Sequence, residues 1–599
     1  MSSNDGKRSD FFSEISGCPL AMRNGWMRQA VQATFRGGEQ AAYTGAYDQP
    51  IVLIFYGGGE TNLCNLHHRE LAEHIAAHLW HTRGWLAAIE PVAAVTDAIA
   101  MGHSYKEDPR LSAMGHSLFS RELFASSVVQ QVEINRADAA IVITGCDKTV
   151  AGGMLAASWL KELPVVLLHG GTIRAGCTSS GRAVQIETAA EAAGMLSAGT
   201  IDEQEHDEIL VQALPAPGGC GVMATSNTMA VLASTLGISV FSSASTPAME
   251  ANHQEIFAAK LAEAREAGDL LVKMCEDQIA LGDLIDRRSF DNAATMLHAI
   301  GGSTNAVIHL PAIAEGFGLS FGLEEIRAKS ATPVLLNLMP AGKFVMVDLY
   351  ERAGGLPVLA RYMADNSLLD LSARTISGST LGELLDGVAP PVFEDPESDV
   401  IRSLESPVKS RSSLVIVKGD HSTPTTTSIA PRGSVFKLNA QELEFEGPAR
   451  VFDRESEAVA AVLEGRIVDG DLIVLRYQGV SIGCPESLRL TSALSGMGSD
   501  SRIAIVTDGR LSGVSRGTLV VHVEPEAWRG GPIALIREGD IIRLDGKTES
   551  LFVRVGADEM AERKRQWTRP ELQLPRGPMR IASQIVRPLE EGALWWPSG

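Results

Sequence analysis

Residues 50–390 alternate short, continuous apolar runs with amphipathic stretches. The apolar runs end in glycine or proline, which is typical of buried strands that lead into turns. A strand, a glycine-rich turn and a helix in succession indicate an open α/β sheet, in which the loops beyond the strand ends hold ligands. The pattern predicts strands in PIVLIFYGGG, AAIVITGC, PVVLLHGG and PVLLNLMP, and helices in HRELAEHIAAHLW, EIFAAKLAEAREAGDLLVKMCEDQIA and LGELLDGV.

The pattern changes at APPVFEDPESDV (389–400), a proline-rich and acidic stretch that we interpret as a connection. It is followed by short β-like runs separated by turns, namely SSLVIVKG, GSVFKLNA, DLIVLRY, RIAIVTDG, TLVVHV and DIIRLDG. Several short strands at close spacing predict a barrel or a sandwich. We therefore expect an N-terminal α/β domain over residues 1–390 and a C-terminal β-barrel-like domain over residues 391–599.

Composition and charge narrow the possible partners. A chain of 599 residues with 45% hydrophobic and 21% charged residues is typical of globular proteins with more than one domain. The formal net charge of −21 and the lack of a basic stripe argue against a nucleic acid partner. We find no signal peptide pattern and no apolar run of membrane-spanning length, so we expect a cytoplasmic protein without a membrane partner.

The cysteines are few, odd in number and widely scattered, which does not fit a disulfide framework. They include no CxxC pair, so spacing alone does not predict a metal site either. In a reducing compartment they remain as buried thiols or as metal ligands. They are Cys18, Cys64, Cys146, Cys177, Cys220, Cys275 and Cys484.

Two local motifs suggest other chemistry. GVSIG (479–483) fits the G-x-S-x-G elbow of serine hydrolases, which would make Ser481 a nucleophile. That elbow needs a helix directly after it, whereas Pro485 follows the motif, and no triad partner is evident. His74 and His78 have the i, i+4 spacing of a metal-binding helix but lack the glutamate of the zincin motif. We interpret these histidines as part of an amphipathic helix.

Residue types suited to metal and acid–base chemistry stand in or beside several turns. In ITGCDKTVAGG a cysteine, an aspartate and a lysine follow an apolar run directly, although each is costly to bury alone. One physical explanation is a shared site where metal, charge and substrate meet. The candidates are Cys64 in NLCNLHHREL, Asp97 in VTDAIAMGH, Cys146, Asp147 and Lys148 in GCDKT, Cys220 in PGGCGVMATSN, Glu486 in GCPESL and Ser512 in VTDGRLSGVSRG.

With these motifs the chain resembles the dihydroxy-acid dehydratase and phosphogluconate dehydratase family over most of its length. Further matching stretches, in family order, are SLFSREL, GGSTNAVIHL, AGGLPVL, IAPRGSVFK and HVEPEAWRGGPIALIREGDIIRLD. The resemblance implies a hydro-lyase that converts a 2,3-dihydroxy carboxylic acid into a 2-oxo acid, and a homodimer or a dimer of dimers. It also implies an iron–sulfur cluster, [2Fe–2S] or alternatively [4Fe–4S], on Cys64, Cys146 and Cys220.

The resemblance further implies Mg²⁺ ligands at Asp97, Asp147, Glu486 and a carbamate formed on Lys148, and a catalytic base at Ser512. These roles agree with elementary chemistry. Three thiolates leave one iron of a cluster open as a Lewis acid for a substrate hydroxyl. A serine hydroxyl is a weak base unless a nearby cation stabilises its alkoxide. A carbamate forms only from a neutral amine, so burial and nearby cations would have to lower the lysine pKa.

Some segments depart from the family pattern, and all of them are expected to border the substrate pocket. SYKEDPRLSAM looks like an insertion, GDHSTPTTTSIAP replaces a shorter stretch, and GVSIGCPES lacks the usual glycine–proline pattern. DAIAMGH and GGCGVMATSNTMA resemble branched-chain members, whereas HVEPEAWRGG resembles sugar-acid members. A branched-chain substrate is slightly preferred, with an aldonic acid as the alternative. A serine hydrolase and a non-catalytic binding module remain as hypotheses from other classes.

Overall fold

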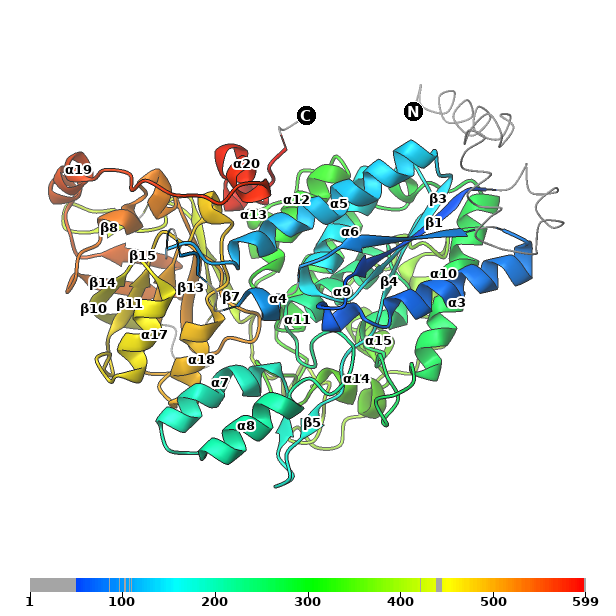
Figure 1. Ribbon diagram of the computed structural model, residues 1–599, viewed down its shortest axis with the longest axis horizontal. Coiled ribbons are helices and arrows are strands. Elements are labelled where there is room, and N and C mark those ends of the chain that lie inside the picture. The colour runs from blue at the N-terminus through cyan, green and yellow to red at the C-terminus, as the bar shows by residue number, and fades with distance from the viewer. Residues whose placement is uncertain are drawn as a thin grey trace.

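The computed structural model describes residues 50–85, 87–95, 97–101, 104–106, 108, 110–420, 422–437 and 444–596. Most of the described strands belong to two sheets, one of four strands and one of nine, which lie at opposite sides of the molecule in Figure 1. The α/β class predicted from the sequence is confirmed. Cys18 lies outside the described residues, so nothing tests its predicted lack of a role.

The four-stranded sheet is entirely parallel, with the order β2-β1-β3-β4. Its strands are β1 (Val52–Gly58), β2 (Ala87–Ala93), β3 (Ala139–Thr144) and β4 (Val165–His169). Every residue of β3 and β4 is buried, and β1 is buried over most of its length. Continuous apolar runs are what strands covered by helices on both faces require. Three of the four predicted strands in this part are therefore confirmed.

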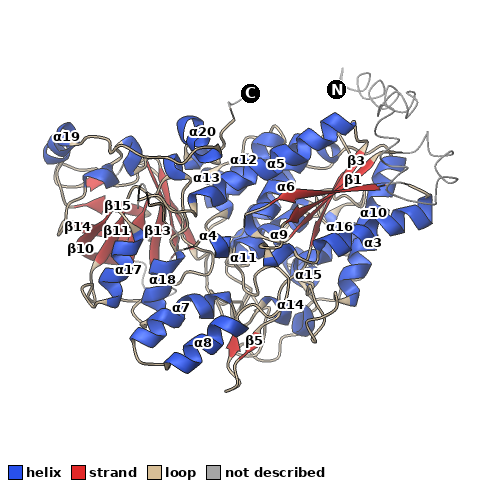
Figure 2. Cartoon of the chain, viewed as in Figure 1, coloured by secondary structure: helices blue, strands red, loops and turns tan. Residues whose placement is uncertain are grey.

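Helices cover both faces of this sheet, as Figure 2 shows. One face is covered by α3 (His68–Arg83) and α10 (Ala258–Glu276), and the other by α5 (Gly115–Asn135) and α6 (Asp147–Trp159). The first two confirm predicted helices, and the third predicted helix is the single turn α16 (Leu381–Leu384). The remaining helices before residue 390 are α4 (Asp97–Ala100), α7 (Ile186–Ser197), α8 (Glu203–Gln212), α9 (Thr225–Leu236), α11 (Arg287–Ala299), α12 (Ala306–Gly316), α13 (Leu323–Arg327), α14 (Met346–Ala353) and α15 (Leu356–Asp365).

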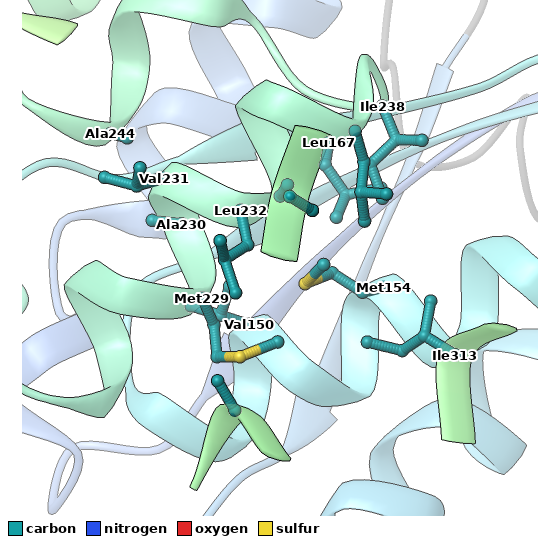
Figure 3. Close-up of a cluster of buried hydrophobic side chains, with 14 of the residues drawn as sticks. Val150, Met154, Leu167, Met229, Ala230, Val231, Leu232, Ile238, Ala244 and Ile313 are labelled. Atoms are coloured by element: carbon teal, nitrogen blue, oxygen red, sulfur yellow. The ribbon is translucent and has the colours of Figure 1, made fainter. Parts of the chain in front are cut away.

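A dense apolar cluster fixes α6 and α9 relative to the sheet (Figure 3). Val150 and Met154 of α6 lie close to Met229 and Leu232 of α9, and all four side chains are fully or almost fully buried. A turn at Gly145 leads into α6, and a glycine-rich loop at residues 218–221 precedes α9. Packing of the two helices therefore fixes where those loops end.

The fourth predicted strand, PVLLNLMP (333–340), is wrong. Val334, Leu336 and Leu338 are buried, but each forms only an isolated bridge, and the three bridges lead to three different segments. The apolar pattern reports burial, which a coil threaded through the core satisfies as well as a ladder does.

The nine-stranded sheet is mixed, with the order β7-β9-β13-β12-β11-β10-β14-β15-β8. The four strands β10 to β13 run parallel, and the outer strands pair antiparallel. The strands are β7 (Leu414–Val417), β8 (Thr427–Ser428), β9 (Gly433–Lys437), β10 (Glu444–Phe452), β11 (Leu472–Leu475), β12 (Ala504–Thr507), β13 (Thr518–Glu524), β14 (Ile541–Asp545) and β15 (Ser550–Val553).

Chain connectivity shows that this sheet curls. β8 lies at one edge and β9 is second from the other edge, yet only residues 429–432 connect them. Five residue steps span at most about 18 Å, whereas seven flat strand spacings would span about 34 Å. The sheet therefore bends round into a half-barrel, which confirms the β-barrel-like prediction.

Helices α17 (Glu455–Leu463) and α18 (Leu488–Gly496) pack on one face of the curled sheet, and α19 (Ala557–Gln566) lies beyond the other. The last helix, α20 (Pro578–Ile585), returns to α5. One hydrophobic core runs without interruption from β1 to β13. The domain boundary at residue 390 therefore stays a prediction, because no gap in the core marks it.

Candidate functional site

Three carboxylates from distant parts of the sequence meet between the two sheets. Asp97 begins α4, Asp147 begins α6, and Glu486 lies in the loop before α18. Their carboxylate oxygens lie within 4.8 Å of one another, and Asp97 Oδ1 and Asp147 Oδ1 are buried without a hydrogen-bond partner. Oxygen ligands grouped in this way are what Mg²⁺ prefers.

Two buried cations lie against this carboxylate set. Lys148 Nζ is 2.5 Å from Asp147 Oδ2 and 3.3 Å from Asp97 Oδ2, and Arg510 contacts Glu486 Oε2 at 3.3 Å. Burial and the Asp97 charge raise the pKa of Asp147 to about 7. For Lys148, burial and Arg510 lower the pKa, but the three carboxylates raise it by more, and the net direction is upward. That is opposite to the direction that carbamate formation requires.

The local fold explains how Cys146, Asp147 and Lys148 reach the site. Cys146 is the N-cap of α6, and its backbone N–H donates to Thr149 Oγ1 at 3.0 Å. The helix begins at the carboxyl end of β3, where ligand-binding loops of parallel sheets lie. Gly145 permits this turn, because a Cβ there would lie 2.7 Å from the ring of His68.

The three candidate thiols also gather here. Cys64 lies in a short 3-10 turn after β1, Cys146 follows β3, and Cys220 precedes α9. Hydrogen bonding to Cys146, burial and the charges of Cys146, Cys220 and Asp147 raise the pKa of Cys64 well above its ordinary value. Burial, Cys146 and Asp147 raise the pKa of Cys220 likewise. A thiolate at these positions would need a nearby cation, and a metal centre would supply one.

The spacing of these thiols differs from that of the carboxylates. Within the described ranges, the carboxylates alone form a set of three or more ligand atoms within 4.8 Å of one another. A single zinc ion would hold its thiolates about 2.3 Å from the metal and would draw the sulfurs closer than that limit. The three thiols as a set are therefore spaced more widely than the carboxylates.

The other described cysteines have different surroundings. Cys177 is exposed and Cys275 is half-buried on α10. Cys484 is buried, but its contact with the site is through its carbonyl oxygen, which accepts from Arg510 Nε at 2.7 Å. Their assignment as non-ligands stays a prediction.

Ser512 lies in the loop after β12 and is 8% exposed. A β-bridge between Glu486 and Arg510 brings this loop to the carboxylates. On the other side, a Cβ at Gly513 would lie 2.9 Å from the backbone of Ala224 and Thr225, which follow the Cys220 loop. The candidate base is thereby held between the segments that carry the carboxylates and the thiols.

The serine-hydrolase motif does not form an elbow. Ser481 lies in the 3-10 turn Val480–Ile482, and the next helix begins only at Leu488. Its hydroxyl donates to Glu526 Oε1 at 2.6 Å, which is a buried structural contact. The hydrolase hypothesis loses its geometric basis.

Two residues that stabilise the site escaped the sequence interpretation. Arg510 is fully buried and ion-paired with Glu486. Asn305 Nδ2 donates to Glu486 Oε2 at 3.0 Å and to Thr225 Oγ1 at 2.9 Å. Arg510 lies in TDGRLSG and Asn305 in GGSTNAVIHL, two stretches that match the family. That match was the sequence signal that could have identified them.

Comparison with known proteins identifies the family of this chain. Residues 49–384 match the family model "Dihydroxy-acid/6-phosphogluconate dehydratase N-terminal", and residues 399–593 match its C-terminal counterpart. The chain belongs to this family. It is therefore a dehydratase, that is, a hydro-lyase.

Individual relatives match over nearly their whole length. A dihydroxy-acid dehydratase of Methylococcus capsulatus is 37% identical over 536 residues, which cover 89% of this chain and 90% of the relative. The dihydroxy-acid dehydratase of Aeropyrum pernix is 37% identical over 92% of this chain and 94% of its own length. That of Francisella tularensis is 36% identical over 95% and 98%.

Proposed function

We propose that this dehydratase converts a 2,3-dihydroxy carboxylic acid into a 2-oxo acid at the carboxylate and thiol site. The observation that carries this proposal is that both ligand sets share one location. Asp147 and Glu486 act electrostatically on Cys220, and Asp147 acts on Cys64. A centre for soft sulfur ligands beside a centre for hard oxygen ligands suits a reaction that removes a hydroxyl and a proton from adjacent carbons.

The residues present fit the two cofactors that the family implies. Cys64, Cys146 and Cys220 would hold a [2Fe–2S] or [4Fe–4S] cluster, whose open iron supplies a Lewis acid for the departing hydroxyl. The oxygens of Asp97, Asp147, Glu486 and the Lys148 carbamate would hold Mg²⁺, which supplies charge stabilisation. A divalent cation on these carboxylates would also offset the charges that raise the Lys148 pKa.

The protein's own residues perform the proton transfer. Ser512, as an alkoxide, removes the proton on C2 while the bond from C3 to its hydroxyl breaks. The hydroxide that leaves takes up a solvent proton and departs as water, and Ser512 then releases its proton to solvent. The enol that results tautomerises to the 2-oxo acid and takes up a solvent proton on C3. Arg510 and Asn305 orient Glu486 so that its carboxylate stays in the site.

A branched-chain substrate is the preferred assignment. An apolar cluster of Val222, Ala224, Leu488 and Val514 lies against Cys220, and two of its members are two residues from Glu486 and Ser512. Such a wall favours an alkyl group on the substrate.

The sugar-acid alternative has a feature in its favour. A polar cavity of about 20 Å³ lies where the inserted segment meets the C-terminal half, and at that size it holds one water or a single hydroxyl group. It is lined by Ser104, Arg110, Ser112, Glu455, Ser456, Gln478 and Arg489. Comparing kcat/KM for branched dihydroxy acids and aldonic acids decides between the two.

The setting of the enzyme is part of the same proposal. A reducing cytoplasm suits an enzyme with unpaired cysteines and a thiolate-held cluster. We also propose a homodimer or a dimer of dimers, and two domains that divide near residue 390. Separately, no helix in the described part of the chain is long and apolar enough to cross a membrane.

Ser512→Ala tests the base assignment. It should lower kcat by about 10²–10⁴-fold and leave KM nearly unchanged, with the visible spectrum and the Mg²⁺ content of the wild type. Ser481→Ala is the matched control and should change kcat and KM only slightly. The proposal fails if Ser481→Ala is inactive and Ser512→Ala is active.

A further inference from the structure

Lys437 is a buried lysine that no motif singled out. It ends β9, is 8% exposed, and its Nζ donates to Gly513 O at 2.7 Å. Within the ranges that the structure describes, it forms no ion pair and this is its one side-chain hydrogen bond. Burying an ammonium without a carboxylate costs free energy, so its position needs an explanation.

The carbonyl that Lys437 holds belongs to the peptide unit between Gly513 and Val514. The N–H of that unit lies 3.5 Å from Ser512 Oγ. In a planar trans peptide the C=O and N–H groups point in opposite directions. Fixing the Gly513 carbonyl on the lysine therefore aims the Val514 N–H at the hydroxyl of Ser512.

The surroundings leave this peptide little freedom to turn. A Cβ at Gly513 would come within 2.9 Å of Ala224 Cα and Thr225 N, so the loop is packed closely on the start of α9. Burial, Lys409 and Arg516 lower the pKa of Lys437 to about 7, and Glu486 opposes them. Both the ammonium and the neutral amine donate hydrogen bonds, so the contact survives titration of the lysine.

We propose that Lys437 is a positioning residue that holds the Gly513–Val514 peptide so that its N–H stabilises the Ser512 alkoxide. The proposal rests on the proposed role of Ser512 as the base. The hydrogen bond from the Val514 N–H to Ser512 Oγ is long in the resting enzyme, and it should shorten when the oxygen becomes charged. Donors fixed in advance at a developing oxyanion are worth about 10²–10³ in kcat.

Lys437→Met tests this inference, because methionine fills similar space without a donor. We expect kcat to fall by about 10²-fold with KM unchanged. Since the alkoxide is less stable, the acidic limb of the kcat–pH profile should move to higher pH, and activity should partly return at alkaline pH. Lys437→Arg keeps a donor and should restore kcat and the position of the limb. Visible spectrum, iron content and Mg²⁺ content should match the wild type in both.

Lys409→Met is the matched control, since it removes a neighbouring charge but not the contact with Gly513. Lys409→Met should leave kcat and the acidic limb of the kcat–pH profile unchanged. Should Lys437→Met not fold, Lys437→Leu, which also lacks a donor, is measured in its place, and a shift of the acidic limb is again expected. A wild-type kcat and profile in the folded neutral variant would overturn the inference. Ser512→Ala measured in the same series separates the two claims. If Ser512→Ala is inactive while the neutral Lys437 variant behaves as the wild type, only the inference about Lys437 fails and the proposed function stands. If Ser512→Ala is fully active, Ser512 is not the base.

Discussion

Three consecutive residues at the start of α6 belong to two different sets of candidate ligands, the thiols and the carboxylates. Cys146 is the N-cap of α6 and has an extended backbone, and its thiol interacts with Cys64. Asp147 and Lys148 lie in the first helical turn, where Lys148 Nζ is 2.5 Å from Asp147 Oδ2 and 3.3 Å from Asp97 Oδ2. Adjacent residues in the sequence thus join the two ligand sets.

Serine substitutions test the thiol set at the residue scale. Cys64→Ser, Cys146→Ser and Cys220→Ser should each lose most of the iron and the visible absorption, because a hydroxyl does not replace a thiolate on iron. Cys275→Ser, on α10 away from the site, should keep iron, colour and turnover. Iron and sulfide analysis of anaerobically purified protein measures this. Full iron content and turnover in any of the first three would remove that residue from the ligand set.

Lys148→Arg tests the carbamate. Arginine keeps the positive charge but cannot form the carbamate, so one Mg²⁺ ligand is lost. We expect near-complete loss of turnover and weaker Mg²⁺ binding by titration, with the visible spectrum unchanged. Turnover like that of the wild type would exclude a carbamate role for this lysine.

At the scale of elements, a close contact between α5 and the loop before α18 sets the position of Glu486. A Cβ at Gly483 would lie 1.9 Å from Gly115 O, and Gly483 has φ +84°. Gly483→Ala should therefore push the loop away from α5. A displacement of about 1 Å can cost about 10²-fold in activity, so we expect a loss of that size together with a higher Mg²⁺ requirement.

Gly498→Ala is the control for backbone strain alone. Gly498 also has a positive φ, +67°, but a Cβ there meets nothing within 4 Å. It should cost about 1–2 kcal/mol of stability and leave the Mg²⁺ requirement unchanged. Equal effects of the two substitutions on Mg²⁺ dependence would contradict the contact argument.

Sequence patterns predicted elements where local composition determines them. The strands β1, β3 and β4 and the helices α3 and α10 follow from runs whose burial is continuous or one-sided. The segment 333–340 failed because burial does not require a ladder. The candidate residues came from motifs, but the partners Arg510, Asn305 and Lys437 depend on contacts between distant segments. Periodicity contains no information on such contacts.

At the scale of the whole molecule, buried carboxyls make stability depend on pH. Glu524 is 2% exposed, and burial together with Glu526 raises its pKa from 4.5 to about 7. Because the folded pKa is the higher one, its favourable contribution is complete below about pH 4.5 and is lost as the pH rises through 7.

Glu524→Gln should therefore stabilise the fold at pH 8 by up to about 3 kcal/mol and change little near pH 4.5. The amide oxygen can still accept from the Leu589 N–H, as the carboxylate does at 3.0 Å. Denaturant unfolding at the two pH values measures this, with the exposed Glu464→Gln as control. A stabilisation that is the same at both pH values would contradict the burial argument.

The account makes one central claim, that this site removes water across C2 and C3 of a dihydroxy acid. The most direct measurement is turnover in D₂O by anaerobically purified protein loaded with iron, sulfide and Mg²⁺, with branched-chain and sugar dihydroxy acids as substrates. We predict a 2-oxo acid that carries one solvent deuterium on C3, because the enol is protonated there. Loaded protein that forms no 2-oxo acid from any of these substrates, or forms one without deuterium on C3, would contradict the claim.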